Sequence, residues 1–477
     1  MEEKKELLLF QLGPVQEFIA QAAEVSDLWA GSYLLSSLVW AGLRQVPDAE
    51  NAAVFPNLQD GRVRAALESE LIPTIPNRFL AWVPAGCGAD VAERVKAAIR
   101  EKLNDHARRT QLPAGAQTQI DQFLQMTWAV LAVADTRPMG ELYRAIGRKL
   151  ALRRNLRDFA PWTEDPAARS VDEGRKDFLS GKETALDKKS GRGALNLMKL
   201  RLPELLQKRI SGDLDVSDRY IAVIALDGDR MGQNLSQFRD EAQHRAFSAA
   251  LADYAGAVGG IVRGFKGELI YAGGDDVLAV VPATEAIGCA RALRERFGDV
   301  RGADGEPLTA SAGIAVGHRS VPLQELVHRA HAAESRAKQD YGRDALAMSV
   351  FKRSGETLEW GCKWTSKSFA LYNGLRDTMK DGFASRFPYK LAALLQPYEL
   401  EKLEQMARAQ MGEVVKLELS HAWSRTTGSG DVPDELKAAM DAYLDETFGN
   451  EGKPKDFLDL FLCETFIDRP REGGEND

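Results

Sequence analysis

Short apolar runs and longer amphipathic segments alternate along the first 140 residues. Three runs predict buried strands: ELLLFQL (6–12), NRFLAWVP (77–84) and MTWAVLAVA (126–134). Gly13-Pro14 ends the first of them. Helical patterns lie between the strands, at 15–43 and 91–103. This order of strands and helices is typical of a ferredoxin-like α+β unit.

A second set of elements begins at RYIAVIAL (219–226), an apolar run that predicts a buried strand. The elements that follow it are a helix at 240–263, a strand, tight turn and strand at 267–282, a helix at 284–298, a strand at 308–318, a helix at 323–342 and a strand at 344–351. The pattern predicts a second unit of β-α-β-β-α-β-α-β order.

The remaining segments predict mainly helices. Apolar runs are short from 140 to 215, where we expect a small helical insert; a solvated linker is the alternative. Helical patterns dominate from 360 to 470. The sequence thus predicts an α+β fold of two ferredoxin-like (palm) domains, an insert between them and a C-terminal helical bundle. The expected ranges are 1–140, 141–215, 216–355, 356–470 and a disordered tail at 471–477.

Composition narrows the class of protein. Hydrophobic residues make up 44% and charged residues 28%, as in globular proteins. Lys and Arg number 62 against 70 Asp and Glu, a net charge of −8, so contacts with nucleic acid must be local or made through basic partners. The four cysteines include no C-x-x-C pair, and we expect no zinc. We also expect a soluble, cytoplasmic protein without a membrane span.

The first candidate for chemistry is Asp227, which directly follows the apolar strand at 219–226. A carboxylate there lies at the end of a sheet. Gly228 permits close approach of the backbone to a ligand, and Asp229 lets the same stretch present a second carboxylate. A simple turn is the alternative for these residues.

The second candidate is Gly273-Gly274-Asp275-Asp276, between two apolar strands. Two glycines fit a hairpin turn. Two adjacent carboxylates repel each other, and a divalent cation such as Mg²⁺ would relieve that repulsion. Two strands of one sheet can bring Asp227 close to this turn, so shared metal ions are expected.

A cation follows on the helix at 323–342. Lys338 lies there, with Gly342 and Arg343 just after it, and a positive charge at this place can neutralise a triphosphate. A solvated lysine is the alternative. The order of Asp227, the Gly-Gly-Asp-Asp turn, SAGIA (311–315) and AKQDYGRD (337–344) resembles the palm of nucleotidyl cyclases and GGDEF-type diguanylate cyclases.

Three departures from that pattern concern the positions around the phosphates. Arg343 follows Lys338 by five residues, one more than in the GGDEF pattern, Asp344 stands in place of Asn, and Val277 in place of Phe. The phosphate roles of Lys338 and Arg343 are therefore left open.

Further segments resemble the large subunit of type III-B CRISPR effector complexes. The matching segments are GPVQEFI (13–19), DLWAGSYLLS (27–36), IPNRFLAWVP (75–84), ALDGDRMG (225–232), AGGDDVLAVVP (272–282) and SRFPYKLA (385–392). They run in the same order as in that family and extend over nearly the whole chain.

The resemblance implies synthesis of cyclic oligoadenylates from ATP when a complex with guide RNA and other subunits binds target RNA. It implies two Mg²⁺ or Mn²⁺ ions held by Asp227, Asp275 and Asp276. The backbone at 228–232, with Gly228, Asp229 and Arg230, would contact the triphosphate. Gly273 and Gly274 would admit the nucleotide, and Lys338 and Arg343 would add positive charge.

The first palm lacks a Gly-Gly-acidic turn, so it resembles a degenerate partner that helps hold a second nucleotide, with Gly13 and Ser32 as candidates. Many members of the family also carry a His-Asp nuclease motif and zinc-binding cysteine pairs. The six histidines here are followed by Ala or Arg, so we expect no DNA cleavage and a metal-free insert. We interpret His328 and His331 as surface residues.

Three alternatives stay open. The first alternative is a non-catalytic scaffold of such a complex, the second is a free-standing cyclase, and the third is a palm protein that joins AMP to a non-nucleotide acceptor. Clustered carboxylates argue against the scaffold, and the degenerate first palm and helical C-terminal segment argue against a free-standing enzyme.

Overall fold

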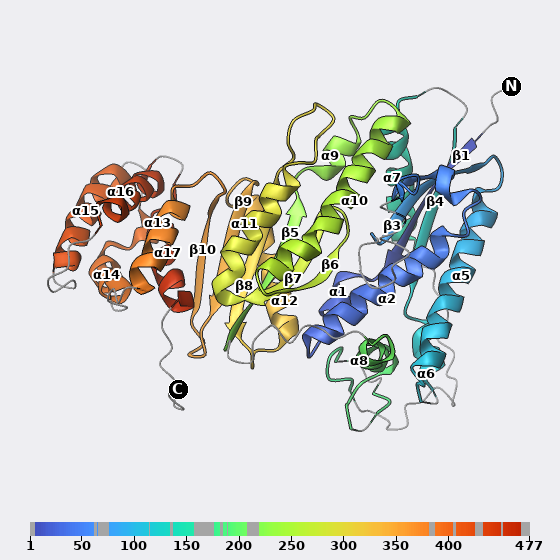
Figure 1. Cartoon of the computed structure of the whole chain (residues 1–477), viewed down its shortest axis with the longest axis horizontal. Coiled ribbons are helices and arrows are strands. Elements are labelled where there is room, and N and C mark those ends of the chain that lie inside the picture. The colour runs from blue at the N-terminus through green and yellow to red at the C-terminus, as the bar shows by residue number, and fades with distance from the viewer. Residues whose placement is uncertain are drawn as a thin grey trace.

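The computed structural model describes residues 5–61, 64, 76–113, 115–133, 137–156, 176–181, 185–187, 189–207, 219–380, 387–403, 407–424, 433–449 and 452–468. Figure 1 shows two sheets side by side, with the C-terminal helices at the far end of the second. No helix in these ranges is both long enough and apolar enough to cross a bilayer.

The first sheet has four strands in the order β2-β3-β1-β4, all antiparallel. They are β1 (Lys5–Gly13), β2 (Ala53–Phe55), β3 (Arg78–Pro84) and β4 (Gln125–Val133). The helices of this unit are α1 (Gln16–Ala20), α2 (Val25–Leu43), α3 (Ala49–Ala52), α5 (Gly88–Arg109), α6 (Ala116–Asp121) and α7 (Met139–Asn155). The order is that of a ferredoxin-like unit, as predicted.

The sequence did not predict the short strand β2, and two further details of the first unit differ from the prediction. The helix expected over 15–43 is two helices, because Glu24 and Asp27 form a capping box that begins α2 anew. We expected the insert to begin at 141, but α7 buries Leu142, Ile146 and Leu150 against the first sheet. The apolar stripe of α7 therefore places it in the first palm, on the face opposite α2 and α5.

The second sheet has six strands in the order β10-β9-β8-β5-β7-β6. The strands are β5 (Tyr220–Gly228), β6 (Glu268–Ala272), β7 (Asp276–Pro282), β8 (Ala310–His318), β9 (Ala345–Phe351) and β10 (Thr357–Lys363). The helices are α9 (Met231–Leu235), α10 (Glu241–Gly264), α11 (Ala286–Phe297) and α12 (Leu323–Gln339). One face packs on α10 and α11, and the other on α12 and on helices of the first palm.

The strand β10 is a correction, because we expected helices from residue 356 onward. It pairs antiparallel with β9 after a turn at Gly355, which has a φ of 89°. Leu358, Trp360 and Cys362 are buried while Thr357 and Glu359 are exposed. This alternation is the period of a half-buried strand.

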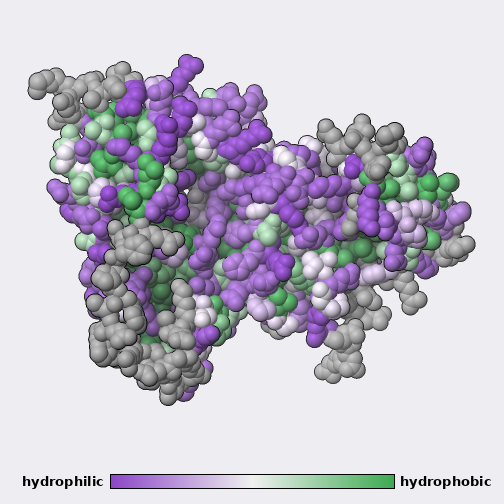
Figure 2. All heavy atoms as spheres, turned by 180° about the vertical axis from the view of Figure 1, so that it is seen from behind, coloured by the Kyte–Doolittle hydropathy of each residue, from purple (hydrophilic) through white to green (hydrophobic). Residues whose placement is uncertain are grey.

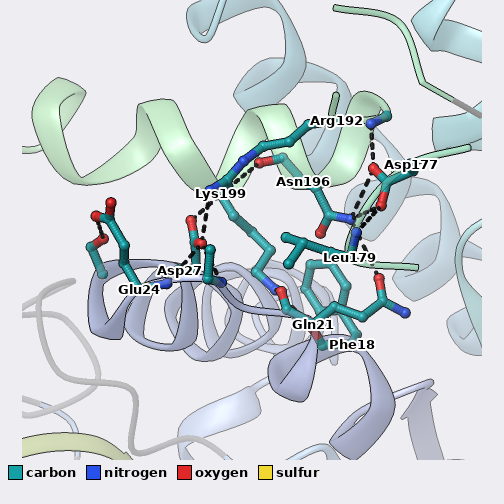
Figure 3. Close-up of polar contacts among 12 residues, drawn as sticks. Phe18, Gln21, Glu24, Asp27, Asp177, Leu179, Arg192, Asn196 and Lys199 are labelled. Carbon is teal, nitrogen blue, oxygen red and sulfur yellow. Dashed lines mark hydrogen bonds and ion pairs between the residues drawn. The ribbon is translucent and has the colours of Figure 1, made fainter. Parts of the chain in front are cut away.

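The insert is anchored to the first palm rather than forming a solvated linker, as far as it is described (176–181, 185–187 and 189–207). Its helix α8 (Ala194–Leu205) packs along α2. Asp27 accepts two hydrogen bonds from Arg192, at 2.7 and 3.0 Å, and both side chains are buried (Figure 3). The buried Lys199 donates from Nζ to the carbonyl oxygens of Phe18 (2.8 Å) and Gln21. Charged groups thus hold the insert in place.

In the described residues after β10 there are five α-helices, as the sequence predicts for this range. They are α13 (Ser368–Lys380), α14 (Phe387–Leu395), α15 (Arg408–Ser424), α16 (Asp434–Phe448) and α17 (Pro454–Asp468). Their core is continuous with that of the second sheet through Trp360, Tyr443 and Phe457. Figure 2, seen from behind, shows a hydrophilic middle, with hydrophobic side chains mainly at the two ends of the molecule.

Candidate active site

Two of the predicted carboxylates meet across neighbouring strands. The antiparallel register of β5 and β7 sets Asp227 opposite Asp276. Asp275 lies in the turn between β6 and β7, where its carbonyl oxygen accepts a hydrogen bond from the backbone N–H of Gly228 at 3.1 Å. Sheet geometry therefore brings all three aspartates to one end of the second palm.

The glycines at this end are required by packing within the protein. Gly274 has a φ of 96°, which the tight turn needs. A Cβ on Gly273 would collide with the ring and hydroxyl of Tyr271. A Cβ on Gly228 would lie 2.8 Å from Cζ of Phe297. We predicted that these glycines admit a nucleotide; what the structure shows is that they allow the turn and β5 to close on their own neighbours.

The helix α12 directs three polar side chains toward the carboxylates. Lys338 forms ion pairs with Oδ2 of Asp227 and with Glu334, the latter at 2.6 Å. His331 lies 3.5 Å from Glu334. A Cβ on Gly313 would collide with the backbone of α12, so this glycine of β8 permits the close approach of the helix.

Glu334 was missed by the sequence analysis, and the interpretation of His331 as a surface residue was wrong. The side chain of His331 is 24% exposed, and the negative charge of Asp276 acts on it. Its spacing from Glu334 and Lys338, three and seven residues, puts all three on one helical face, and this spacing is the signal that could have identified them.

The electrostatics of the cluster disfavour full ionisation. Burial raises the pKa of Asp227 to about 6, although the Lys338 ammonium acts in the opposite direction. Burial, with the charges of Asp227 and Asp275, raises the pKa of Asp276 to about 7. Burial also raises the pKa of Asp275. The three carboxylates thus need more positive charge than Lys338 supplies, and a divalent cation is a group that would supply it.

The carboxylates do not form a closed set of metal ligands. Among the described residues, no group of three His, Cys, Asp or Glu side chains is arranged to hold a metal ion. Mg²⁺ usually binds one or two carboxylates and completes its shell with water and substrate phosphates. Asp227 and Asp276 fit that role as cross-strand neighbours, and the binding of two ions stays a prediction.

Asp229 does not face the carboxylate cluster. Its carboxylate accepts hydrogen bonds from the hydroxyls of Thr309 and Ser311, both at 2.8 Å, and from the backbone N–H of Asp344 at 2.9 Å. The side chain is buried. We predicted a nucleotide contact here, but protein donors occupy this carboxylate, so Asp229 joins β5 to β8 and to the loop after α12.

Arg230 and Arg343 lie together at a different place from the aspartate cluster. Both line an open cavity of about 290 Å³, which Asp227, Asp275 and Asp276 do not line. The other lining residues are Asp229, Asn234, Asp304, Glu306, Pro307, Leu308, Thr309, Gly342 and Asp344. Asp344 accepts two hydrogen bonds from Arg294, at 2.9 and 2.7 Å, which gives the acidic residue at this position a structural role.

The loop that carries Arg343 is fixed by contacts with β10 and α17, two elements that follow it in the chain, and the sequence did not indicate these contacts. Gly342, Arg343 and Asp344 all have positive φ. The hydroxyl of Tyr341 contacts both carboxylate oxygens of Asp456 on α17 at 3.0 Å. Lys363 of β10 donates to the carbonyl oxygens of Gly342 and Arg343, at 3.0 and 2.7 Å. The strained loop is thus fixed by β10 and α17.

The second sheet has an antiparallel core, with an aspartate at the end of its central strand and an acidic hairpin turn beside it, which is the arrangement of a palm domain. Residues 220–347 match the family model described as "Cas10/Cmr2, second palm domain". Residues 7–108 match "CRISPR-associated protein Cmr2, N-terminal". Segments of both sheet units are thus similar to models of the Cas10/Cmr2 family.

Curated relatives match part of the chain. The "CRISPR system Cmr subunit Cmr2" of Pyrococcus furiosus (strain ATCC 43587 / DSM 3638 / JCM 8422 / Vc1) is 29% identical over 233 residues, 42% of this chain and 26% of the relative. A Streptococcus thermophilus protein, "CRISPR system single-strand-specific deoxyribonuclease Cas10/Csm1 (subtype III-A)", is 26% identical over 206 residues, 40% of this chain and 26% of the relative. The chain thus spans about a quarter of each relative's length.

Solved structures share the fold over nearly the whole chain. A chain of the type III-B Cmr-beta complex in its apo state superposes with a TM-score of 0.65 at 11% identity, covering 97% of this chain and 82% of that one. A chain of the Csm1–Csm4 cassette in complex with cA4 gives a TM-score of 0.55 at 14% identity, covering 98% of this chain and 70% of that one.

Proposed function

We propose that the chain is the large subunit of a type III-B CRISPR complex in the cytoplasm and makes cyclic oligoadenylates from ATP when the complex binds target RNA. The observation that carries the proposal is the cluster of Asp227, Asp275 and Asp276 beside Lys338. The choice of product is supported by the Csm1–Csm4 cassette, which was solved in complex with cA4 and contains a chain of the same fold.

In the proposed step, the 3′-hydroxyl of one ATP attacks the α-phosphorus of another. A 3′–5′ phosphodiester forms, the bond from the α-phosphorus to the bridging oxygen breaks, pyrophosphate leaves and the hydroxyl proton passes to water. The same attack within the linear product, by its own 3′-hydroxyl on its 5′ α-phosphorus, releases a second pyrophosphate and closes the ring. Such transfer depends on positioning and charge neutralisation. Bound Mg²⁺ or Mn²⁺ would activate the hydroxyl and stabilise the leaving pyrophosphate.

The chain's own residues hold and neutralise the reactants. Asp227 and Asp276 would hold the cations, with Asp275 beside them in the turn. A cation held by Asp227 would free the ammonium of Lys338 from part of its ion pair, and Lys338 would then neutralise charge on the triphosphate. Arg230 and Arg343 line the neighbouring 290 Å³ cavity, where their guanidinium groups would bind further phosphate oxygens.

A test uses the chain assembled with its partner subunits and guide RNA, given radiolabelled ATP and Mn²⁺ with and without complementary RNA. We expect RNA-dependent products that disappear in the D275A/D276A variant, and their mass distinguishes cyclic adenylates from AMP joined to another acceptor. If the assembled complex makes no product, the chain is a scaffold. No histidine here precedes an aspartate, and we propose that single-stranded DNA added to this assay stays intact.

A further inference from the structure

The helix α7 concentrates positive charge in an acidic protein. Five cations, Arg144, Arg148, Lys149, Arg153 and Arg154, accompany a single carboxylate, Glu141, so the helix carries +5 − 1 = +4. The whole chain has a net charge of −8. All five cationic side chains are exposed.

An open cavity of about 510 Å³ lies at the N-terminal half of this helix. Its lining residues are Arg137, Glu141, Arg144, Ala145 and Arg148. Arg144 and Arg148 are one turn apart, about 6 Å along the axis. Neither forms a hydrogen bond or an ion pair with another described residue. Their guanidinium groups are thus available to an anionic ligand.

The helix is held rigidly beneath this cavity. Its opposite face is buried on the first sheet, Lys149 donates to the carbonyl oxygen of Val130 at 3.2 Å, and Arg153 lies 4.8 Å from the ring of Trp128. The backbone N–H of Gly140 donates to the carbonyl oxygen of Phe238, in the segment between α9 and α10, at 2.8 Å. A ligand would therefore meet arginines on a fixed support.

We propose that the basic face of α7, defined by Arg144 and Arg148, binds the sugar-phosphate backbone of RNA. Guanidinium groups match phosphate oxygens in pairs. Among the described residues that line the cavity, Ala145 is the one apolar side chain, whereas the centre of a protein–protein interface is usually apolar. That the polyanion is RNA rather than DNA rests on the proposed function.

The test measures binding of a labelled single-stranded oligoribonucleotide to the purified full chain over a range of salt concentrations, without ATP or divalent cations. The R144E/R148E variant should bind more weakly. The slope of log K against log salt concentration should become shallower by about 1.4, because each of the two lost phosphate contacts contributes about 0.7. Ultraviolet crosslinks in the unaltered chain should map to 137–156. Because no turnover is measured, failure here leaves the proposed nucleotidyl transfer untouched.

The control is R94E/R100E on α5, where Arg94 and Arg100 are exposed and each follows or precedes a glutamate, Glu93 or Glu101. This variant should leave binding unchanged. An equal loss in both variants would show unspecific charge attraction and overturn the proposal. Evidence that a protein binds this face would also overturn the proposal. In that case R144E/R148E would bind RNA as the unaltered chain does, and L152S/L156S would lose a partner subunit. The latter variant replaces two exposed leucines, one on α7 and one directly after it. An oligodeoxyribonucleotide bound equally well would reject the choice of RNA.

Discussion

The buried ion pair between Asp27 and Arg192 should control the docking of the insert. The two side chains are 1% and 6% exposed and make two hydrogen bonds with each other. The D27N variant keeps the size of the side chain and removes the charge. Arg192 would then be left as a buried cation, with the carbonyl oxygen of Asn196 at 3.2 Å and the ring of Phe178 as its remaining partners.

Removing one partner of a buried pair costs about 3–5 kcal/mol, because the other charge stays desolvated. We expect the lower end, about 3 kcal/mol, since Arg192 keeps two contacts and the amide oxygen of the D27N side chain can still accept from the backbone N–H of Ala23. A loss of about 3 kcal/mol corresponds to roughly a hundredfold faster amide exchange in α8, if α8 opens by undocking from α2.

The assay is hydrogen exchange of α8 in the full chain, together with urea unfolding. D299N removes the exposed ion pair with Arg296 and should cost at most about 1 kcal/mol. The double variant D27L/R192M removes both charges and should regain much of the stability lost in D27N. Unchanged exchange in D27N, or additive losses in the double variant, would refute the argument.

Three other predictions concern the second palm and the pH dependence of stability. D229A should lower the melting temperature, because two hydroxyls and one backbone N–H lose their acceptor at a cost of about 1–3 kcal/mol each. D276N should leave the melting temperature unchanged or raise it, because it removes the repulsion between Asp276 and the carboxylates of Asp227 and Asp275. Y341F should raise the KM for ATP more than it lowers kcat, because it frees the loop of Arg343 from α17; an unchanged KM would contradict this. Burial lowers the pKa of His106 from 6.5 to about 4, although Asp105 beside it acts in the opposite direction. Between pH 6.5 and 4 the unfolded chain therefore binds more protons at this histidine than the folded chain, so the folded state loses stability as the pH falls. H106Q should lose less stability than the unaltered chain over this range, as measured by urea unfolding at each pH.

The strands at the centre of each sheet were predictable because both their faces are buried. Residues 220–226 read as a continuous apolar run that ends at Asp227. The Gly-Gly turn before Asp276 indicates a hairpin, and the register of β5 and β7 sets Asp276 opposite Asp227. Local sequence alone therefore placed the aspartate cluster correctly.

Long-range contacts explain what the sequence could not predict. Asp229 has the spacing of a second site carboxylate, yet donors from β8 and from the loop after α12 occupy it, and these partners are about 80 and 115 residues away in the chain. The apolar stripe of α7 indicates burial but not the sheet that covers it. Asp27 belongs to the segment DLWAGS, and its partner Arg192 lies 165 residues away in a stretch that reads as polar linker.

The central claim is that ATP and divalent cations bind between Asp227, Asp276 and Lys338. A structure of the assembled complex with a non-hydrolysable ATP analogue and Mn²⁺, located by its anomalous scattering, tests this most directly. The account predicts Mn²⁺ between Asp227 and Asp276, with the triphosphate reaching Lys338. Mn²⁺ and nucleotide bound elsewhere, with the ion pair of Asp227 and Lys338 intact, would contradict it.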